Sequence, residues 1–227
     1  GSADLLEALG VAINLDGRLV EQCVSQLRIG FCFAPIFHPA MRHAAPARKE
    51  LGEPTVFNIL GPLANPAKPK SAAIGVANER MHLVMAQVLG DRGVDGFVFR
   101  GDDGLDEITL TTTTQVLTIG NGEIESGIID PPSFGIKNSP LSELVGGDAN
   151  QNAEIAKRIF AGEKGAPRDA VLLNSAAAIA AYNNDIELPL QVRIEDALKE
   201  AAYAIDSGSA QNLLERWVKL TQAMVNS

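Results

Sequence analysis

Residues 72–99, AAIGVANERMHLVMAQVLGDRGVDGFVF, decide the fold class of this chain. A short apolar run at 72–76 is followed by an amphipathic stretch at 81–89 and by a second apolar run at 95–99. A strand, a helix and a strand at this spacing predict a crossover connection between two parallel strands. We therefore predict an α/β fold with a mostly parallel central sheet flanked by helices.

The segments that follow extend this sheet and cover it. Two predicted strands, at 115–119 and 123–129, flank Gly120-Asn121-Gly122, a sequence typical of a β-hairpin turn. The remaining downstream sequence has helical periodicity, with predicted helices at 149–160, 168–182, 194–207 and 210–225. His82, on the predicted helix at 81–89, is expected to be a surface or helix-side residue.

The sequence before residue 67 predicts shorter elements. Helices are expected at 3–9 and 21–27, and Phe31-Cys32-Phe33 is expected to be a short buried strand. A helical run from His38 to Leu51 should kink at Pro46. A further short helix is predicted at 55–60, followed by a loop at 61–66.

The composition excludes several classes of protein. Hydrophobic residues make up 46% of the 227 residues and charged ones 21%, which is ordinary for a folded globular chain. The longest nearly apolar run, 171–182, is shorter than the ~20 residues that a membrane span requires. The net charge of −9 argues against binding to a nucleic-acid backbone, because such proteins usually present a basic surface. Cys23 and Cys32 show no metal-binding spacing and fit a pair of reduced cytosolic thiols.

An acidic segment, Gly101-Asp102-Asp103-Gly104-Leu105-Asp106-Glu107, follows the second predicted strand. Ligand sites of open α/β sheets lie beyond the carboxyl ends of the strands, where this segment is placed. Carboxylates this close together suit Mg²⁺, which takes one or two of them with phosphate and water oxygens. A solvated acidic turn is an equally good interpretation from composition alone. The threonines at 111–114 are either strand residues or hydroxyl donors beside this segment.

Two further segments carry candidate binding residues. On a mildly bent helix His38, Met41 and Arg48 lie on one side, a strip that could hold an aromatic carboxylate. The residues alone favour a solvated basic face there. Gly146-Gly147-Asp148 resembles a phosphate cradle at a helix start, but the Asp148 carboxylate would repel an anion, so a structural turn is the preferred interpretation.

Taken together, several motifs resemble the anthranilate phosphoribosyltransferase family. They are Phe33-Ala34-Pro35, His38-Pro39-Ala40-Met41, Arg48-Lys49-Glu50-Leu51-Gly52, the segment FNILGPLANP at 57–66, and Gly104-Leu105-Asp106-Glu107. The resemblance continues through Gly146-Gly147-Asp148 and RDAVLLN at 168–174 to the final helix, so it covers essentially the whole chain.

The resemblance implies a reaction and a set of site residues. The family joins the anthranilate amine to C1 of phosphoribosyl pyrophosphate and releases pyrophosphate, in tryptophan biosynthesis. Asp106 and Glu107 would hold Mg²⁺ against the leaving group, and Arg48 would bind the anthranilate carboxylate. The aromatic slot or its entrance would be formed by Ala34, Pro35, His38, Gly61 and Pro62. Met41 stands where some members carry an aromatic residue, so the wall of the slot is expected to differ.

The resemblance concerns the C-terminal two-thirds of the family's sequence. The family's Gly-Thr-Gly-Gly-Asp phosphate loop, its Asn-x-Ser-Thr element and its Lys-His-Gly-Asn segment do not occur here. Residues 1–36 and 67–227 would form a partial α/β phosphoribosyltransferase domain, and 37–66 would be helices of an otherwise missing small helical domain. The family implies a cytoplasmic homodimer when complete, and inactivity of this stretch alone. The alternative is a non-catalytic, nucleic-acid-binding relative, which the net charge and the intact Asp106-Glu107 pair disfavour.

Overall fold

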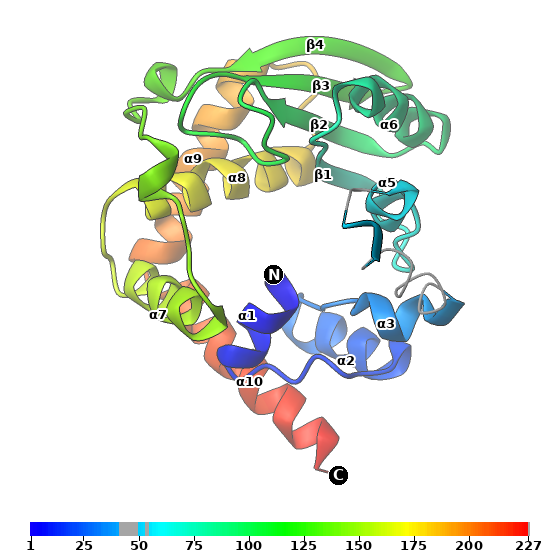
Figure 1. Ribbon diagram of the computed structural model, residues 1–227, viewed down its shortest axis with the longest axis vertical. Coiled ribbons are helices and arrows are strands. Elements are labelled where there is room, and N and C mark those ends of the chain that lie inside the picture. The colour runs from blue at the N-terminus through cyan, green and yellow to red at the C-terminus, as the bar shows by residue number, and fades with distance from the viewer. Residues whose placement is uncertain (41–49, 53–54, 227) are drawn as a thin grey trace. The chain divides into compact units, whose positions relative to one another are not determined.

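The computed structural model describes residues 1–40, 50–52 and 55–226, with only the backbone path at 56–58. Contacts between residues divide the chain into two compact units. The first unit comprises Gly1–Pro66, Gly146–Gly162 and Ile205–Ser227, and the second comprises Ala67–Val145 and Glu163–Ala204. The helices and strands of the two units are labelled in Figure 1.

The second unit contains a four-stranded sheet in the order β1-β2-β3-β4. The strands are β1 (Ser71–Gly75), β2 (Asp95–Gly101), β3 (Thr114–Gly120) and β4 (Glu123–Ile129). β1 and β2 are parallel, whereas the β2–β3 and β3–β4 pairs are antiparallel. The α/β class and the parallel crossover pair are confirmed. The prediction of a mostly parallel sheet is wrong for the described strands, because only β1 and β2 are joined by a crossover helix, while the tight turn at 121–122 requires antiparallel neighbours.

The crossover helix α6 (Glu79–Asp91) begins at Asn78, whose side chain accepts a hydrogen bond from the Met81 N–H at 3.1 Å. Its residue His82 is buried, and the ring Nε2 donates to the Val98 carbonyl of β2 at 2.9 Å. The expectation of a surface histidine is therefore wrong. The reason is that α6 packs directly on β2 and β3, so its inward face is covered along its whole length.

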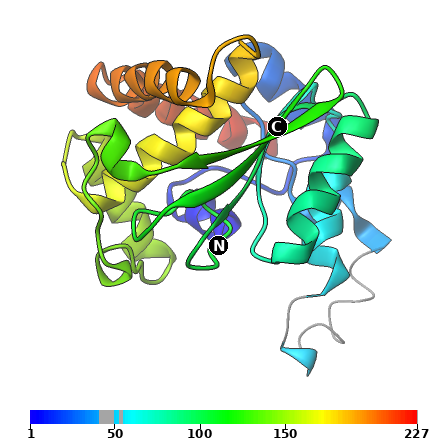
Figure 2. The same cartoon turned by 90° about the horizontal axis from the view of Figure 1, so that it is seen from above.

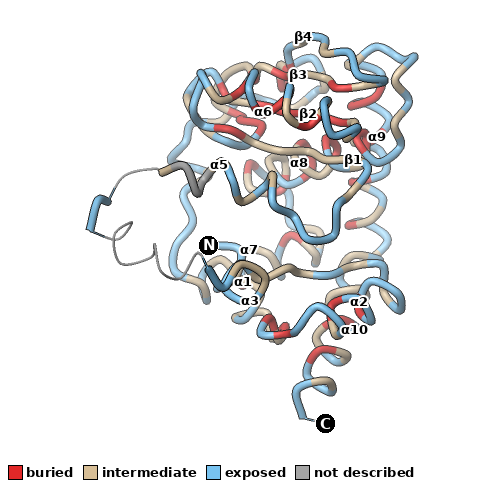
Figure 3. The backbone as a smooth tube through the Cα atoms, turned by 90° about the vertical axis from the view of Figure 1, so that its right-hand side faces the viewer, coloured by how far each residue is buried: buried red, intermediate tan, exposed pale blue. Residues whose placement is uncertain are grey.

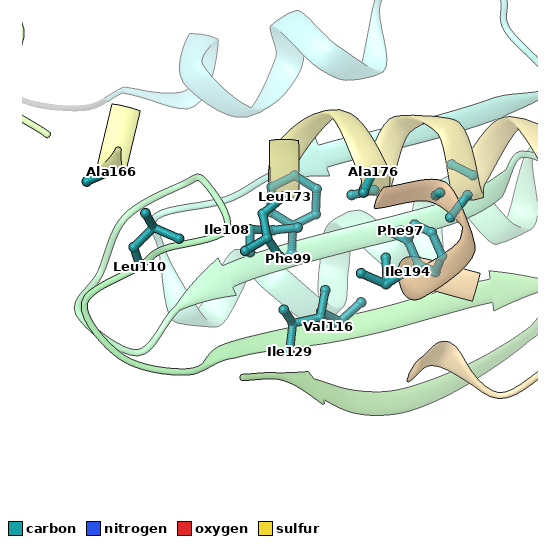
Figure 4. Close-up of a cluster of buried hydrophobic side chains, with 14 residues drawn as sticks. Phe97, Phe99, Ile108, Leu110, Val116, Ile129, Ala166, Leu173, Ala176 and Ile194 are labelled. Atoms are coloured by element: carbon teal, nitrogen blue, oxygen red, sulfur yellow. The ribbon is translucent and has the colours of Figure 1, made fainter. Parts of the chain in front are cut away.

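Two helices cover the sheet from the side opposite α6 (Figure 2). They are α8 (Ala166–Asn183), which contacts β1 and β2, and α9 (Leu190–Asp206). The small side chains Ala176 and Ala177 are fully buried, which lets α8 approach the sheet closely. Phe97, Ile194 and Leu173 fill the core between strands and helices (Figure 4). Two short 3₁₀ turns, Pro131–Phe134 and Leu141–Glu143, follow β4.

The first unit is helical in its described part. Its helices are α1 (Ser2–Ala8), α2 (Gly17–Leu27), α3 (Ala34–Phe37), α5 (Val56–Leu63), α7 (Ala149–Phe160) and α10 (Ser209–Val225). Val11, Ile13, Leu15 and Trp217 form its buried core, with α2 packed on α10 and α1 on α7. Buried positions of the first unit lie at 11–15 and on α2, α7 and α10, and those of the second unit lie mainly on β2, β3, α6, α8 and α9 (Figure 3).

Two predictions before residue 67 are wrong. Residues 31–33 are not a strand: no neighbouring strand pairs with them among the described residues, and the Phe31 and Phe33 rings stack at 6.2 Å beside the apolar core instead. α5 continues past the predicted loop start at residue 61 to Leu63. Pro62 is tolerated because it lies in the last turn, where its missing N–H costs a single helical hydrogen bond.

The predicted domain boundary near residue 66 coincides with a boundary between the units. Residues 1–36, however, group with 37–66 in the first unit and not with the sheet. The assignment of 37–66 to a separate helical domain stays a prediction, and most of the predicted helix at 38–51 lies outside the described residues. Both cysteines are free, as expected. No helix in the described ranges combines the length and apolarity needed to cross a membrane.

Candidate functional site

The acidic loop, defined here as residues 102–113, connects β2 to β3 at the carboxyl end of the parallel pair β1–β2. It crosses over the end of β1, where a Cβ atom at Gly75 would lie 1.4 Å from the Asp106 carbonyl oxygen. Only glycine allows this approach, because the obstacle is backbone and cannot move aside as a side chain could. The absence of a side chain at Gly75 thus sets how closely the loop approaches the sheet.

The base of the acidic loop is held by hydrogen bonds that each involve a main-chain group. The Arg100 Nε donates to the Ala77 carbonyl at 2.8 Å, which links the end of β2 to the segment after β1. The Gly101 N–H donates to the Leu105 carbonyl at 2.9 Å and closes a tight turn. Further along, the Thr109 N–H donates at 3.1 Å to the hydroxyl of Thr114, a fully buried residue. The loop is therefore a fixed element of the second unit.

Two carboxylates of the loop are satisfied by the loop's own donors. Asp103 accepts hydrogen bonds from the hydroxyls of Thr109, at 2.6 Å, and of Thr111, and from the Leu105 N–H at 3.2 Å. Asp102 accepts from the hydroxyl of Thr113 and from the Gln115 amide at 3.1 Å. Both interpretations of the threonines at 111–114 therefore apply. Thr111 and Thr113 are hydroxyl donors within the acidic loop, and Thr114 begins β3.

The hydrogen bonds to Asp103 change its acidity. Partial burial on its own would raise the pKa of this carboxyl, but the hydrogen bonds from Thr109, Thr111 and Leu105 outweigh it, and the pKa is lowered from the ordinary aspartate value. Asp103 therefore stays ionised as part of the loop's architecture.

Asp106 and Glu107 are in the opposite situation. In the described part of the chain, no other residue donates a hydrogen bond from an N–H or hydroxyl group to either side chain, and both residues are exposed. Partial desolvation, the neighbouring Asp106 and the charge of Asp103 together raise the pKa of Glu107, against a weaker opposing effect of its own N–H. Negative charge is thus concentrated at this pair without donors from other residues to neutralise it.

This donor set fits a divalent cation with hard-oxygen preference. Among the described residues no three or more His, Cys, Asp or Glu side chains are grouped to hold a metal ion. Two adjacent carboxylates are nevertheless a sufficient protein contribution for Mg²⁺, which usually takes its remaining oxygens from water and substrate phosphates. A cation at Asp106 and Glu107 would also relieve the repulsion that raises the pKa of Glu107.

The expected aromatic-slot residues lie in the first unit, and not all of them are described. Ala34 and Pro35 are exposed in the first turn of α3, and His38 ends that helix with its N–H donating to the Ala34 carbonyl at 2.8 Å. Gly61 and Pro62 lie in the last turn of α5. The structure thus brings Ala34, Pro35 and His38 into a single turn. Met41 and Arg48 lie outside the described residues.

Gly146-Gly147-Asp148 is a helix cap, as expected. The Asp148 carboxylate accepts from the Gln151 N–H at 2.9 Å, and the Gln151 side chain accepts from the Asp148 N–H at 3.1 Å. Asn152 bonds both backbone groups of Gly147. These side chains occupy the space in which a phosphate would have to sit, so the turn is structural.

Residue-by-residue reasoning missed Asn174. Its side chain, on α8, makes hydrogen bonds to both backbone groups of Ile108, the residue that follows Glu107. The only sequence signal was a polar residue within an alanine-rich helix, which does not tell which distant backbone it contacts.

The chain is similar in sequence to known proteins along nearly its whole length. The chain is 52% identical over 227 residues to an anthranilate phosphoribosyltransferase of Rhodococcus jostii, covering 100% of this chain and 63% of the relative. It is 54% identical over 219 residues to the enzyme of that name from Saccharopolyspora erythraea, covering 96% and 62%. The chain therefore spans a little under two-thirds of the length of these curated relatives.

Solved structures give the same result. The anthranilate phosphoribosyltransferase of Thermus thermophilus matches with a TM-score of 0.85 and 39% identity, covering 98% of this chain and 64% of its own. The Saccharomyces cerevisiae enzyme, solved in complex with PRPP and Mg, matches with a TM-score of 0.87 and 27% identity, covering 98% and 63%. The yeast enzyme has also been solved with 4-fluoroanthranilate.

A family model described as the α/β domain of a glycosyl transferase family matches residues 1–211. The match includes the acidic loop, the glycine at the end of β1 and the whole of α8. The chain belongs to this glycosyl transferase family.

Proposed function

We propose that the chain is part of an anthranilate phosphoribosyltransferase, a pentosyltransferase that joins anthranilate to phosphoribosyl pyrophosphate and releases pyrophosphate. Relatives of that name are about 50% identical along the whole chain. Since the chain spans under two-thirds of their length, the activity is assigned to the complete enzyme that contains it. Within that enzyme the chain supplies the metal-binding carboxylates and the anthranilate-binding residues.

The observation that carries this proposal is the pair Asp106-Glu107. Its carboxylates lie at the carboxyl ends of parallel strands and accept no hydrogen bond from an N–H or hydroxyl of another residue in the described chain. Partial desolvation, together with the neighbouring acids, raises the pKa of Glu107. A solvated structural turn would satisfy its carboxylates internally, as Asp102 and Asp103 are satisfied. The pair is suited to a phosphate-bound cation.

We assign Mg²⁺ to Asp106 and Glu107. When bound, the ion would neutralise the charge that develops on the departing pyrophosphate. The two carboxylates would hold the cation at a fixed place on the loop and so orient the pyrophosphate end of the substrate. Asp102 and Asp103 keep that loop in position, because their hydrogen bonds bind its two arms together.

Arg48 is proposed to bind the anthranilate carboxylate, with Ala34, Pro35, His38, Met41, Gly61 and Pro62 around the aromatic ring or its entrance. A guanidinium matches a carboxylate through two parallel hydrogen bonds and so orients the amine as well as binding the acid. The amine of anthranilate is largely unprotonated at neutral pH, so no strong base is required of this chain. Positioning and charge neutralisation supply the rate enhancement.

Steady-state kinetics of the complete enzyme test this function. Consumption of anthranilate, followed by its fluorescence, should require both phosphoribosyl pyrophosphate and Mg²⁺. Arg48→Ala removes one partner of a charge pair, a change that costs about 2–5 kcal/mol when the pair is buried. The lower figure corresponds to about a 30-fold change in affinity, so the KM for anthranilate should rise by that factor or more, or turnover should be lost. Arg80→Ala, which removes the same charge from an exposed position of α6, is the matched control.

Unchanged anthranilate kinetics in Arg48→Ala would refute the role of Arg48. Absence of any reaction between the two substrates in the complete enzyme would refute the function itself.

We also propose that the complete enzyme is a cytoplasmic homodimer, as the family resemblance implies. Sedimentation of the complete enzyme tests the dimer. A nucleic-acid-binding role has no support in the charge of the chain, which is −9.

A further inference from the structure

Asn174 is a half-buried polar residue in the alanine-rich middle of α8. Its neighbours Leu173, Ala176 and Ala177 are buried in the core of the second unit. The Asn174 Oδ1 accepts a hydrogen bond from the Ile108 N–H at 2.9 Å, and its Nδ2 donates to the Ile108 carbonyl at 2.9 Å. The same Nδ2 donates to the Ala170 carbonyl one turn earlier in α8, at 3.0 Å. One side chain of α8 thus satisfies both backbone groups of Ile108.

The pair of bonds to Ile108 copies the exchange made by opposite residues in an antiparallel ladder. Ile108 lies outside any strand and is 1% exposed, so water cannot replace a lost partner at its backbone. A side chain must both accept and donate to satisfy Ile108, and a carboxamide does so with rigid spacing. Aspartate could accept from the N–H but would place a second acceptor against the carbonyl.

Ile108 directly follows Glu107, and its side chain is anchored in the hydrophobic core near Leu173 (Figure 4). On the other side of the pair, the Asp106 carbonyl lies against Gly75 of β1, at the distance that excludes any Cβ there. The backbone of residues 106–108 is therefore held from two sides, by β1 and by the Asn174 side chain of α8. Neither contact involves the carboxylates, which remain available to a ligand.

We propose that Asn174 is a positioning residue for the carboxylate pair: its two hydrogen bonds to Ile108 fix the backbone on which Asp106 and Glu107 stand. The inference rests on the proposed function, because the pair is taken to hold the substrate's Mg²⁺. Without Asn174 the pair keeps its charge and chemistry but loses its fixed geometry. Binding of Mg²⁺ with phosphoribosyl pyrophosphate should then weaken, while binding of anthranilate should not.

The contact is tested first without substrate or metal, by site-resolved amide hydrogen exchange of the chain. Exchange at the Ile108 amide should be slow in the unaltered chain and at least tenfold faster in Asn174→Ala. Asn183→Ala is the matched control, because Asn183 lies on the same helix, is exposed, and donates to Glu200 instead. Unchanged exchange at Ile108 in Asn174→Ala would overturn the contact, whatever the enzyme does.

The positioning role is tested next in the complete enzyme, by calorimetric titration of Mg²⁺ in the presence of phosphoribosyl pyrophosphate and by the KM for anthranilate. Asn174→Ala should raise the apparent Mg²⁺ dissociation constant about tenfold and leave the anthranilate KM within twofold of the original. A merely structural defect would lower the amount of active protein without this split. If Asn174→Ala does not fold, Asn174→Asp replaces it, since it keeps the shape and the bond from the Ile108 N–H.

Three results are distinguishable. Faster exchange at Ile108 with unaltered Mg²⁺ binding would overturn the positioning role and leave the proposed function standing. Unaltered Mg²⁺ binding in Asp106→Asn with Glu107→Gln would instead remove the proposed function and this inference with it. Faster exchange, weaker Mg²⁺ binding and unchanged anthranilate KM together are the expected result.

Discussion

Two turns rich in glycine and aspartate use their carboxylates in opposite ways. In the turn Gly146-Gly147-Asp148, the Asp148 carboxylate caps α7 and accepts the Gln151 N–H. In the acidic loop, Asp103 is satisfied in the same manner by Thr109 and Leu105. Asp106 and Glu107, in that same loop, accept no hydrogen bond from an N–H or hydroxyl of another residue in the described chain.

The difference teaches how a ligand-binding acid is distinguished from a structural one. Glycines and carboxylates occur in both turns, so composition alone does not separate them. What separates them is whether the fold supplies hydrogen-bond donors. Asp103, which has internal donors, has a lowered pKa and holds the loop together. Glu107, which is partly desolvated and close to other acids, has a raised pKa and gains from an external cation.

The largest expected effect comes from removing the charge of the unsatisfied pair. In the complete enzyme, Asp106→Asn with Glu107→Gln should lower kcat by about 100-fold or more, because neutralisation of the developing charge on pyrophosphate is lost. Steady-state kinetics over a range of Mg²⁺ concentrations measure this. Unaltered kcat and Mg²⁺ dependence would refute the assignment of the pair.

Asp148→Ala is the comparison variant for that experiment, since it removes a carboxylate from the other turn. It should cost about 1 kcal/mol of stability through the lost helix cap. Its kcat and Mg²⁺ dependence should be those of the original enzyme. A loss of Mg²⁺ dependence in this variant would remove the distinction between the two turns.

A smaller effect is expected from Asp103→Asn, which should lower stability by about 1 kcal/mol at neutral pH, or roughly 2–4 °C in Tm, after allowance for its exposure. Because the folded-state pKa of Asp103 lies below its ordinary value, its contribution is fully present above the unfolded pKa and is lost as the pH falls through the folded pKa. Thermal unfolding from pH 7 downwards measures this. The two stability curves should converge in acid, and a constant gap at every pH would contradict the account.

The smallest expected effect is a gain in stability. The pKa of Glu107 is raised in the folded chain, so the ionised side chain destabilises the fold. This loss of stability develops as the pH rises from the unfolded-state pKa through the folded-state pKa. Glu107→Gln should therefore stabilise the metal-free chain at neutral pH, by about 0.5 kcal/mol because the residue is exposed. Urea unfolding at pH 7 gives the sign, and a destabilised variant would show that Glu107 has a structural partner.

Local structure was predictable where local periodicity or capping determines it. The crossover β1-α6-β2, the hairpin at 121–122 and the bounds of α7 with its Asp148 cap all follow from spacing and end signals. Residues 31–33 were expected to be a strand because they are apolar, but a strand also needs a partner, which local sequence does not specify. The burial of His82 likewise depends on the packing of α6 against β2.

The candidate site was predictable only in part. The position of the acidic loop followed from the strand before it, and the identity of its metal-binding pair followed from family resemblance. The division of its acids into satisfied and unsatisfied carboxylates could not be predicted, since it depends on which hydroxyl or N–H each oxygen meets. The contact between Asn174 and Ile108 joins residues 66 positions apart, beyond the reach of any local pattern.

The most direct test of the division between these carboxylates is the position of the metal itself. A crystal of the complete enzyme with phosphoribosyl pyrophosphate and Mn²⁺ in place of Mg²⁺ would locate the ion by its anomalous scattering. We predict a peak within about 2.5 Å of carboxylate oxygens of Asp106 and Glu107, with Asp102 and Asp103 keeping their hydrogen bonds to Thr113, Thr109 and Thr111. A metal bound by Asp102 or Asp103, with Asp106 and Glu107 free, would contradict the account.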